Sequence, residues 1–268
     1  MNAALSRTTE SLPVDIRLMQ GATVLLALAL VVMALAALAW WGVRHPAFAL
    51  AGITVQGDVA HSNAVTLRAN VAPRMSGNFF TVNLAETQRA FEAVPWVRRA
   101  VVRREFPNRL RVQLQEHQVA AYWGLEGESR LLNSFGEVFE ANTGDVDRDD
   151  LPRLAGPDAD SQAVLQMYRT LAPLVEKLDA SLEELELSVR GSWRARLDNG
   201  ARIELGGGTA AEVTQRLERF AQTLTQVASR YSRRPGQDLE SADLRHRDGY
   251  ALKLRGVTTL APMAASGK

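Results

Sequence analysis

The chain has 268 residues, which is enough for one large domain or two modest ones. Its 31 basic and 30 acidic residues leave a formal net charge of +1, so the overall charge does not indicate a nucleic-acid-binding protein, for which a markedly basic domain is expected. There is no cysteine, which excludes disulfides, thiolate metal sites and cysteine nucleophiles and is compatible with any redox compartment.

A long apolar stretch lies near the N-terminus. The segment Gly21–Gly42 carries no charged residue. As a helix it would rise roughly 33 Å at about 1.5 Å per residue, which matches a hydrocarbon core of about 30 Å. Trp40 and Trp41 lie at one end, where amphipathic rings prefer the membrane interface. We therefore predict a transmembrane helix over 21–42, preceded by a cytoplasmic tail over 1–20.

A cleaved signal peptide is the alternative interpretation, because Ala37–Ala39 reads Ala-Leu-Ala and resembles a cleavage site. The apolar region of a signal peptide usually has about 7–15 residues, and this one is longer, so an uncleaved anchor is favoured. Two arginines and two acidic residues in the first twenty positions give only a weak positive-inside signal. A short tail before the helix and a large domain after it favour export of the C-terminal part.

Residues 48–117 predict a small module in the order strand, helix, helix, strand, strand. Its first helix is expected between a cap at Ser62 or Asn63 and a stop at Pro73. Its second helix begins at Asn83, which precedes Glu86 by the spacing of a capping box.

The last two strands of this module form the arginine-rich stretch 97–117. Alternation of apolar and polar residues over 109–115 predicts a half-buried strand, and Pro107 and Asn108 predict the turn before it. The arginines could mark nucleic acid, but a solvated sheet face is favoured, since the anchor is expected to place them outside the cytoplasm. The six arginines of the stretch are Arg98, Arg99, Arg103, Arg104, Arg109 and Arg111.

Residues 118–256 predict a second, β-rich domain with two helices. This domain is expected to end with a strand near 250–256. Asn199-Gly200 lies between two alternating runs, so we expect a two-residue hairpin turn with positive φ at both positions. A helix capped by Thr209 and Glu212 follows. The tail over 257–268 is expected to be disordered. The predicted fold class is α+β, with one transmembrane helix, a β-α-α-β-β domain and a mixed β-sheet domain.

We find no constellation of catalytic residues, and we predict no enzyme, metal site or cofactor. Gly206–Gly208 precedes a helix and could cradle a phosphate, but no Gly-Lys-Ser/Thr follows, so a flexible turn is favoured. The acidic cluster over 183–186 is interpreted as a solvated strand edge. The histidines stand far apart, in no metal-ligand spacing, at His45, His61, His117 and His246.

Several strings, spread in order over nearly the whole chain after the helix, resemble the bacterial FtsQ/DivIB family of cell-division proteins, whose first extramembrane domain is of the POTRA type. The family usually has tyrosine after its Asp-Leu-Arg, where this chain has His246. The strings lie at Val94–Trp123, Leu131–Ala141, Leu151–Pro157, Ser192–Gly206, Arg216–Phe220 and Ala242–Leu254.

The resemblance implies a non-enzymatic scaffold of the division machinery in the inner membrane at the division septum, essential for septum assembly, with its N-terminus cytoplasmic and its domains periplasmic. It implies that FtsB and FtsL bind the last strands of the β-domain, that the POTRA domain contacts other division proteins, and that no nucleic acid is bound. Carried over by position, the partner-binding residues are Arg190, Arg245, His246, Asp248, Gly249, Tyr250, Leu252 and Leu254.

Two other functions stay open on the residues alone. A periplasmic POTRA-type chaperone or secretion-assembly module would need more POTRA copies, or a barrel built from alternating segments of about ten residues. A periplasmic hydrolase would need a pocket with perturbed carboxylates in the β-rich domain.

Overall fold

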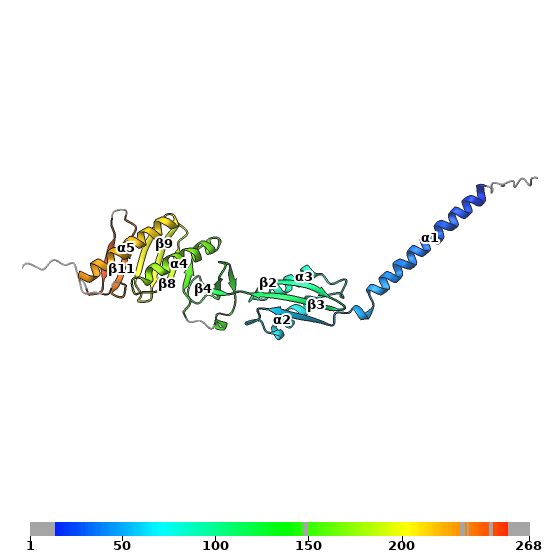
Figure 1. Ribbon diagram of the computed structural model, residues 1–268, viewed down its shortest axis with the longest axis horizontal. Helices are drawn as coiled ribbons and strands as arrows, with labels where there is room; N and C mark the ends of the chain where they lie inside the picture. The colour runs from blue at the N-terminus through cyan, green and yellow to red at the C-terminus, as the bar shows by residue number, and fades with distance from the viewer. Residues whose placement is uncertain (1–13, 147–149, 231–233, 235, 247–248, 257–268) are drawn as a thin grey trace, which may run out of the picture. The chain divides into compact units, whose positions relative to one another are not determined.

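The computed structural model describes residues 14–146, 150–230, 234, 236–246 and 249–256 (Figure 1). The predicted tail over 1–20 lies partly outside the described residues. The predicted tail over 257–268 and Asp248 lie wholly outside them. The chain divides into two compact units. Unit 1 comprises residues 1–59, 63–93 and 99–114, and unit 2 comprises residues 60–62, 94–98 and 115–268.

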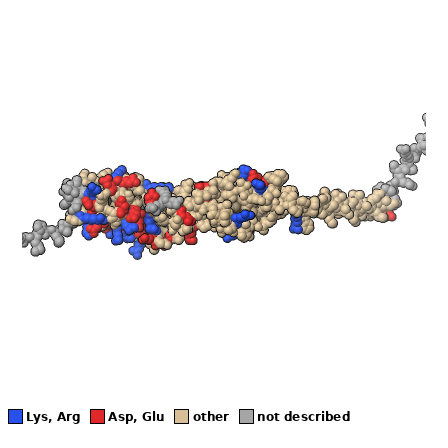
Figure 2. Space-filling view, turned by 90° about the horizontal axis from the view of Figure 1, so that it is seen from below, with Lys and Arg blue, Asp and Glu red and all other residues tan. Residues whose placement is uncertain are grey.

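Unit 1 begins with helix α1, Val14–Val43, which is longer than the predicted span because its regular hydrogen bonding starts before the apolar stretch. Within it, Leu18–Val43 is long and apolar enough to cross a membrane, with a mean hydropathy of 2.7, and none of it is buried against protein. A core helix of a soluble protein would bury its apolar side chains, whereas none of this window is buried, and Figure 2 shows a face of the helix almost free of charged residues.

A three-stranded sheet and two helices follow, which confirms the predicted β-α-α-β-β order. The strand order is β1-β3-β2, with β1 parallel to β3. Side chains cap the helix starts as predicted. Asn63 Oδ1 accepts from Thr66 N at 2.8 Å, and Asn83 Oδ1 accepts from Ala85 N and Glu86 N. The elements are β1 Gly52–Gly57, α2 Ala64–Val71, α3 Leu84–Glu92, β2 Val97–Glu105 and β3 Arg109–Glu116, with short 3₁₀ turns η1 Pro46–Phe48 and η2 Ala72–Arg74.

The two faces of β3 differ as the alternation predicts. Leu110 and Val112 are fully buried and Leu114 nearly so, whereas the residues between them are exposed. The arginines predicted on the solvated face, at 99, 103, 109 and 111, are all exposed, whereas Arg98 and Arg104 have partners that the sequence did not indicate. Arg98 donates to Glu137, and Arg104 donates to backbone carbonyls, because a guanidinium on a strand edge can reach acceptors on a neighbouring segment.

Unit 2 is built on a nine-stranded mixed sheet in the order β12-β11-β10-β9-β8-β7-β4-β5-β6. Two helices, α4 and α5, contact each other and lie over one face of this sheet (Figure 1). The helices are α4 Ser161–Glu176 and α5 Ala210–Arg230, and the strands are β4 Val119–Trp123, β5 Arg130–Asn133, β6 Val138–Glu140, β7 Arg153–Ala155, β8 Leu182–Leu187, β9 Ser192–Leu197, β10 Arg202–Gly207, β11 Leu239–Asp243 and β12 Ala251–Leu254.

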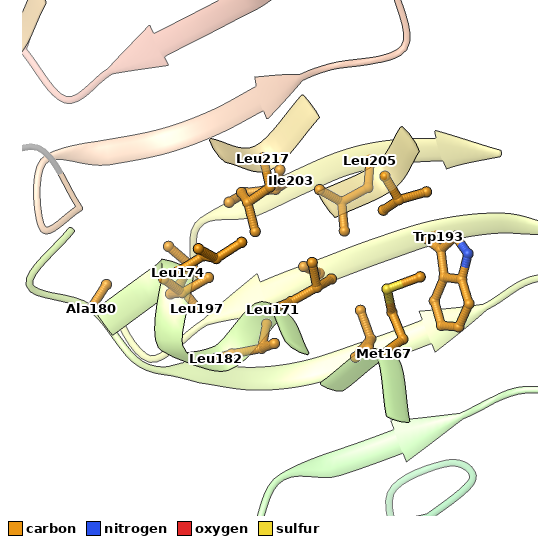
Figure 3. Close-up of a cluster of buried hydrophobic side chains, with 14 of the residues drawn as sticks. Met167, Leu171, Leu174, Ala180, Leu182, Trp193, Leu197, Ile203, Leu205 and Leu217 are labelled. Atoms are coloured by element: carbon orange, nitrogen blue, oxygen red, sulfur yellow. The ribbon is translucent and has the colours of Figure 1, made fainter. Parts of the chain in front are cut away.

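The core of unit 2 lies between this sheet and the two helices. Leu197 and Ile203 point from β9 and β10 toward Leu171 of α4 and Leu217 of α5, and Trp193 of β9 lies beside Met167 of α4 (Figure 3). Because side chains alternate along a strand, the intervening residues of β9 face away from the helices.

That opposite face of the sheet carries a ladder of charges. Arg194 pairs with Glu186 and Glu204 across neighbouring strands, at 3.2 and 2.8 Å, and Arg196 pairs with Glu184. The prediction that the acidic cluster over 183–186 forms a strand edge is therefore wrong, because β8 lies inside the sheet between β7 and β9. Its carboxylates are neutralised by arginines of the neighbouring strand β9.

The hairpin between β9 and β10 also differs from the prediction. Gly200 has a φ of 82°, but Asn199 is not among the residues with positive φ. Leu197 N donates to Ala201 O, so the loop has three residues, with glycine alone in the left-handed position. Asn199 instead donates through Nδ2 to Gly236 O at 2.7 Å, a tertiary contact that the two-residue turn would not provide.

We predict that Leu110→Ala lowers the free energy of unfolding of unit 1 by about 2–5 kcal/mol, because it leaves a cavity at a fully buried position. The adjacent Arg111→Gln should cost only about 0–1 kcal/mol, since its ion pair with Glu105 lies at the surface. Urea unfolding of the full chain in detergent, followed by hydrogen exchange at β3 amides, measures both. Equal losses would contradict the assignment of faces.

Candidate protein–protein interface

Strand β12 lies at one end of the nine-stranded sheet. Its one neighbour in that order is β11, with Ala251 opposite Asp243 and Leu254 opposite Leu239. Within the described residues no strand pairs with its other edge. An edge of this kind presents unpaired N–H and C=O groups, to which a strand of another chain can add.

The direction of the amides along β12 follows from one hydrogen bond. Arg255 N donates to Asp238 O at 2.9 Å, so this amide points toward β11. Amides alternate in direction along a strand, which places those of Lys253 and Ala251 toward β11 and those of Leu252 and Leu254 toward the open edge.

The apolar side chains of this segment serve the core of unit 2. The ring of Tyr250 meets Phe220 of α5 edge to face, with centroids 5.1 Å apart. Leu252 is half-buried against the core and Leu254 is 4% exposed. These three predicted partner-binding residues therefore hold the strand on its own unit, and what the edge offers to another chain is its backbone.

The polar predicted residues gather at the end of the sheet where β12 begins. Ser192 opens β9 opposite Gly207, the last residue of β10. On the next strands, Leu244 N donates to Glu204 O at 2.9 Å, so Arg245 follows at the same end. His246 and Gly249 are exposed there.

Arg190 lies in the turn between β8 and β9, two residues before Ser192, and is exposed. The structure thus brings Arg190, Arg245, His246 and the start of β12 to one end of the sheet. Leu252 and Leu254 lie farther along the edge.

A shallow depression of about 440 Å³ opens at this end of the sheet. Arg216, Arg219 and Arg245 line it against a single carboxylate, that of Glu212, so its net charge is positive. We refer to it as the basic depression. The lining residues are Ser192, Gly206, Gly207, Glu212, Gln215, Arg216, Arg219, Arg245 and His246.

The three glycines at 206–208 make room for these arginines. The guanidinium of Arg216 donates to the carbonyl oxygens of Leu205 and Gly207. Gly206 has a φ of 79°, and a Cβ there would lie 2.9 Å from Arg216 Nη1 and 3.0 Å from Arg245 Cγ. The segment is thus a close-packed support for two arginines, and neither the flexible turn nor the phosphate cradle considered from the sequence describes it.

Asp243 fixes the orientation of Arg245. Its carboxylate accepts from Arg245 Nε at 2.9 Å, from Nη2 at 2.6 Å and from the backbone N at 3.0 Å. The guanidinium hydrogen bonds lower the pKa of Asp243 from 3.8 to about 2, and the carboxylate in turn raises the pKa of Arg245. The arginine is therefore held in one orientation at the surface before any partner arrives.

Two segments of the chain match known protein families. Residues 48–117 match the family described as POTRA domain, FtsQ-type, and residues 121–245 match the C-terminal domain of cell division protein FtsQ/DivIB. The chain belongs to the FtsQ/DivIB family. This confirms the predicted family and α+β architecture, and it identifies a cell-division protein, for which the unburied helix α1 fits a single-pass membrane anchor.

Relatives named cell division protein FtsQ align over most of their length. The protein of Thiomonas arsenitoxydans is 37% identical over 94% of this chain and 92% of its own. That of Burkholderia pseudomallei is 40% identical over 90% and 93%, and that of Bordetella pertussis 38% identical over 87% and 89%. The match to the C-terminal domain of the FtsQ/DivIB family contains Arg190 and Arg245 and ends before β12.

Arg216, Arg219 and Asp243 were missed by the sequence reasoning as members of this site. The string Arg216–Phe220 and the Asp-Leu-Arg at 243–245 were the available signals, but neither shows that the two segments meet. Within the described ranges no group of His, Asp and Glu residues is arranged to hold a metal ion.

A second cluster in unit 2 also escaped the sequence reasoning. The imidazole of His61 stacks on Trp96, and that of His117 stacks on Phe139, each with centroids 4.0 Å apart. Burial lowers the pKa of His117. His61 is exposed in the bend before α2 and His117 is half-buried, and the aromatic rings that stack on them come from distant parts of the chain.

The Asp243–Arg245 pair predicts a pH dependence. Because the pKa of the folded carboxyl, about 2, lies below its ordinary 3.8, the carboxylate stabilises this segment above about pH 4 and loses that effect as the pH falls toward 2. In Arg245→Gln the titration midpoint should rise toward the ordinary value, because the largest cause is removed. Carbon-detected NMR of the Asp243 carboxyl measures it, and an unchanged midpoint would contradict the assigned cause.

Proposed function

We propose that this chain is a non-enzymatic scaffold of the division machinery, required for septum assembly, that links early and late division proteins and binds FtsB and FtsL through the open edge of β12. The observation that supports this most directly is the unpaired edge of β12 in a sheet whose other described strands in this region are paired on both sides. Strand addition would satisfy the outward N–H and C=O groups of 252 and 254.

The basic depression supports a contact larger than the strand itself. Specific interfaces bury about 1,200–2,000 Å² in total, and an edge of four residues supplies only part of that. A partner strand on β12 that continues past Tyr250 would reach Arg245, His246 and the depression. Acidic side chains would be favoured there, because three arginines outnumber the carboxylates of Glu212 and Asp243.

We infer the topology from the helix and the family. Residues 1–20 would be cytoplasmic, 21–42 would span the inner membrane, and the domains at 48–117 and 118–256 would be periplasmic, at the division septum. The apolar, unburied surface of α1 supports the span. The POTRA domain would contact other members of the division machinery.

The strand-addition proposal predicts that Leu252→Pro weakens FtsB–FtsL binding about tenfold relative to Leu252→Ala. Both variants shorten the same half-buried side chain, but only proline removes the outward amide. A lost hydrogen bond is worth about 0.5–1.5 kcal/mol, and the proline ring also obstructs the approaching strand. Titration of purified full-length chain in detergent with the FtsB–FtsL pair gives the two affinities.

Lys253→Pro is the matched control, because its amide faces β11. This variant should lower the thermal unfolding temperature of unit 2 more than Leu252→Pro does. Truncation before Tyr250 should abolish binding. The proposal fails if the truncated chain, or the Leu252→Pro variant, binds the pair as tightly as the unaltered chain.

The topology predicts that Val189→Cys reacts in intact spheroplasts with a maleimide that cannot cross the membrane. The chain has no other cysteine, and Val189 is 93% exposed in the turn before β9. A cysteine placed at Ala4, in the expected cytoplasmic tail, should react only after the membrane is opened. Reversed labelling would contradict the orientation, and loss of the Ala4 label by cleavage would show a signal peptide.

A further inference from the structure

Four phenylalanines of unit 1 come together from three separate segments of the chain. The ring of Phe80 meets Phe48 at 4.8 Å and Phe79 at 5.2 Å between centroids, and Phe79 meets Phe106 at 6.3 Å. We call these the aromatic cluster. Phe79 is buried at its centre, whereas Phe80 is 46% exposed and Phe106, at the tip of the β2–β3 hairpin, is 78% exposed.

The aromatic cluster lies close to the end of the membrane helix, whatever the tilt of that helix. Phe48 follows Val43 by five residues, which span at most roughly 18 Å when fully extended. Phe79 N donates to Phe48 O at 2.9 Å, and Asn78 Nδ2 donates to Val43 O at 2.5 Å. At the hairpin tip, Ala51 N donates to Asn108 O at 2.9 Å, so this turn belongs to the same end.

Hydrogen bonds hold the exposed rings in place. Arg104 donates through Nε to Phe79 O at 2.7 Å and through Nη2 to Val82 O at 2.9 Å, which joins the 79–82 loop to the hairpin that carries Phe106. Asn78 Oδ1 accepts from Phe80 N at 3.0 Å. The loop therefore does not need to be ordered by a ligand, and the two exposed rings are presented from a rigid support.

Positive charge lies on both sides of the hairpin tip that carries Phe106. Arg103 and Arg109 flank the hairpin tip and are exposed, and within the described residues their side chains make no hydrogen bond or ion pair. Glu105, the acidic residue between them, is paired with Arg111. Single exposed apolar residues are common on protein surfaces. Two exposed rings of one cluster, whose member Phe48 follows the apolar helix by five residues, with two exposed arginines beside the hairpin tip, are a more specific arrangement.

We propose that this surface docks on the phospholipid interface of the membrane in which α1 is anchored. Phe106 and Phe80 enter the boundary between headgroups and acyl chains, and Arg103 and Arg109 bind lipid phosphates, with anionic lipid favoured. Apolar rings leave water there, and guanidinium groups match phosphate geometry. Arg104 is a positioning residue, since it holds the loop and does not itself reach the lipid. The docking orients unit 1 relative to the membrane plane.

The absence of cysteine makes the test direct. In Phe106→Cys, an environment-sensitive fluorophore on the thiol reports contact with lipid, and Val65→Cys on α2 is the matched control, because both native side chains are 78% exposed. Val65 lies in unit 1 and is not a member of the aromatic cluster. The full chain is reconstituted at one copy per nanodisc of phosphatidylcholine and phosphatidylglycerol, with spin-labelled lipid as quencher.

We expect the label at 106 to be quenched several-fold more than the label at 65 and to emit at shorter wavelength. Quenching at 106 should increase with the phosphatidylglycerol fraction, and Arg103→Gln combined with Arg109→Gln should remove that increase. Equal quenching at 106 and 65 would overturn the proposal. So would shielding of position 106 that appears only with several copies per disc or only with an added partner protein.

Discussion

The pairing of β12 with β11 is the interaction on which the candidate interface depends. It directs alternate amides of β12 into the sheet, and Leu254 and Tyr250 attach the strand to the core beneath α5. The remaining amides are left at an open edge. A strand that were paired on both sides could not accept a partner, and one without a core attachment would not hold its edge in a fixed position.

Arginine has a structural role at several places where its count alone would indicate a charged surface. Arg104 joins a loop to a hairpin, and Arg216 binds the carbonyls at the end of β10. Arg98 donates to Glu137 at 2.7 and 2.9 Å, which lowers the pKa of that carboxyl to about 2. The planar guanidinium, with five donors, suits such sites, because it can satisfy two carbonyls or both oxygens of a carboxylate at once. Glycine at 206 and 208 leaves room for one of these guanidinium groups, since any side chain there would occupy the space of Arg216.

Local patterns predicted most of the fold. The caps at Asn63 and Asn83, the alternation over 109–115 and the reciprocal cap between Thr209 and Glu212 each depend on residues only three or so positions apart, and each is present in the structure. The prediction failed where distant segments intervene. The Asn199 turn took a different form because its side chain binds the 236–237 backbone, and the acidic cluster on β8 lies inside the sheet because β7 pairs beside it.

By itself, the sequence determined the long apolar helix, the β-α-α-β-β order, the β-rich second domain and the family, because hydropathy, periodicity and ordered strings are properties of short segments. Only the tertiary structure decided which residues share a site. Arg216, Arg245 and Ser192 are far apart in the sequence and meet because three strands end together. Likewise Phe48, Phe80 and Phe106 form one surface because Arg104 and two backbone hydrogen bonds join their loops. The order of strands in a sheet depends on which long-range pairings bury the most apolar surface, and no short segment contains that information.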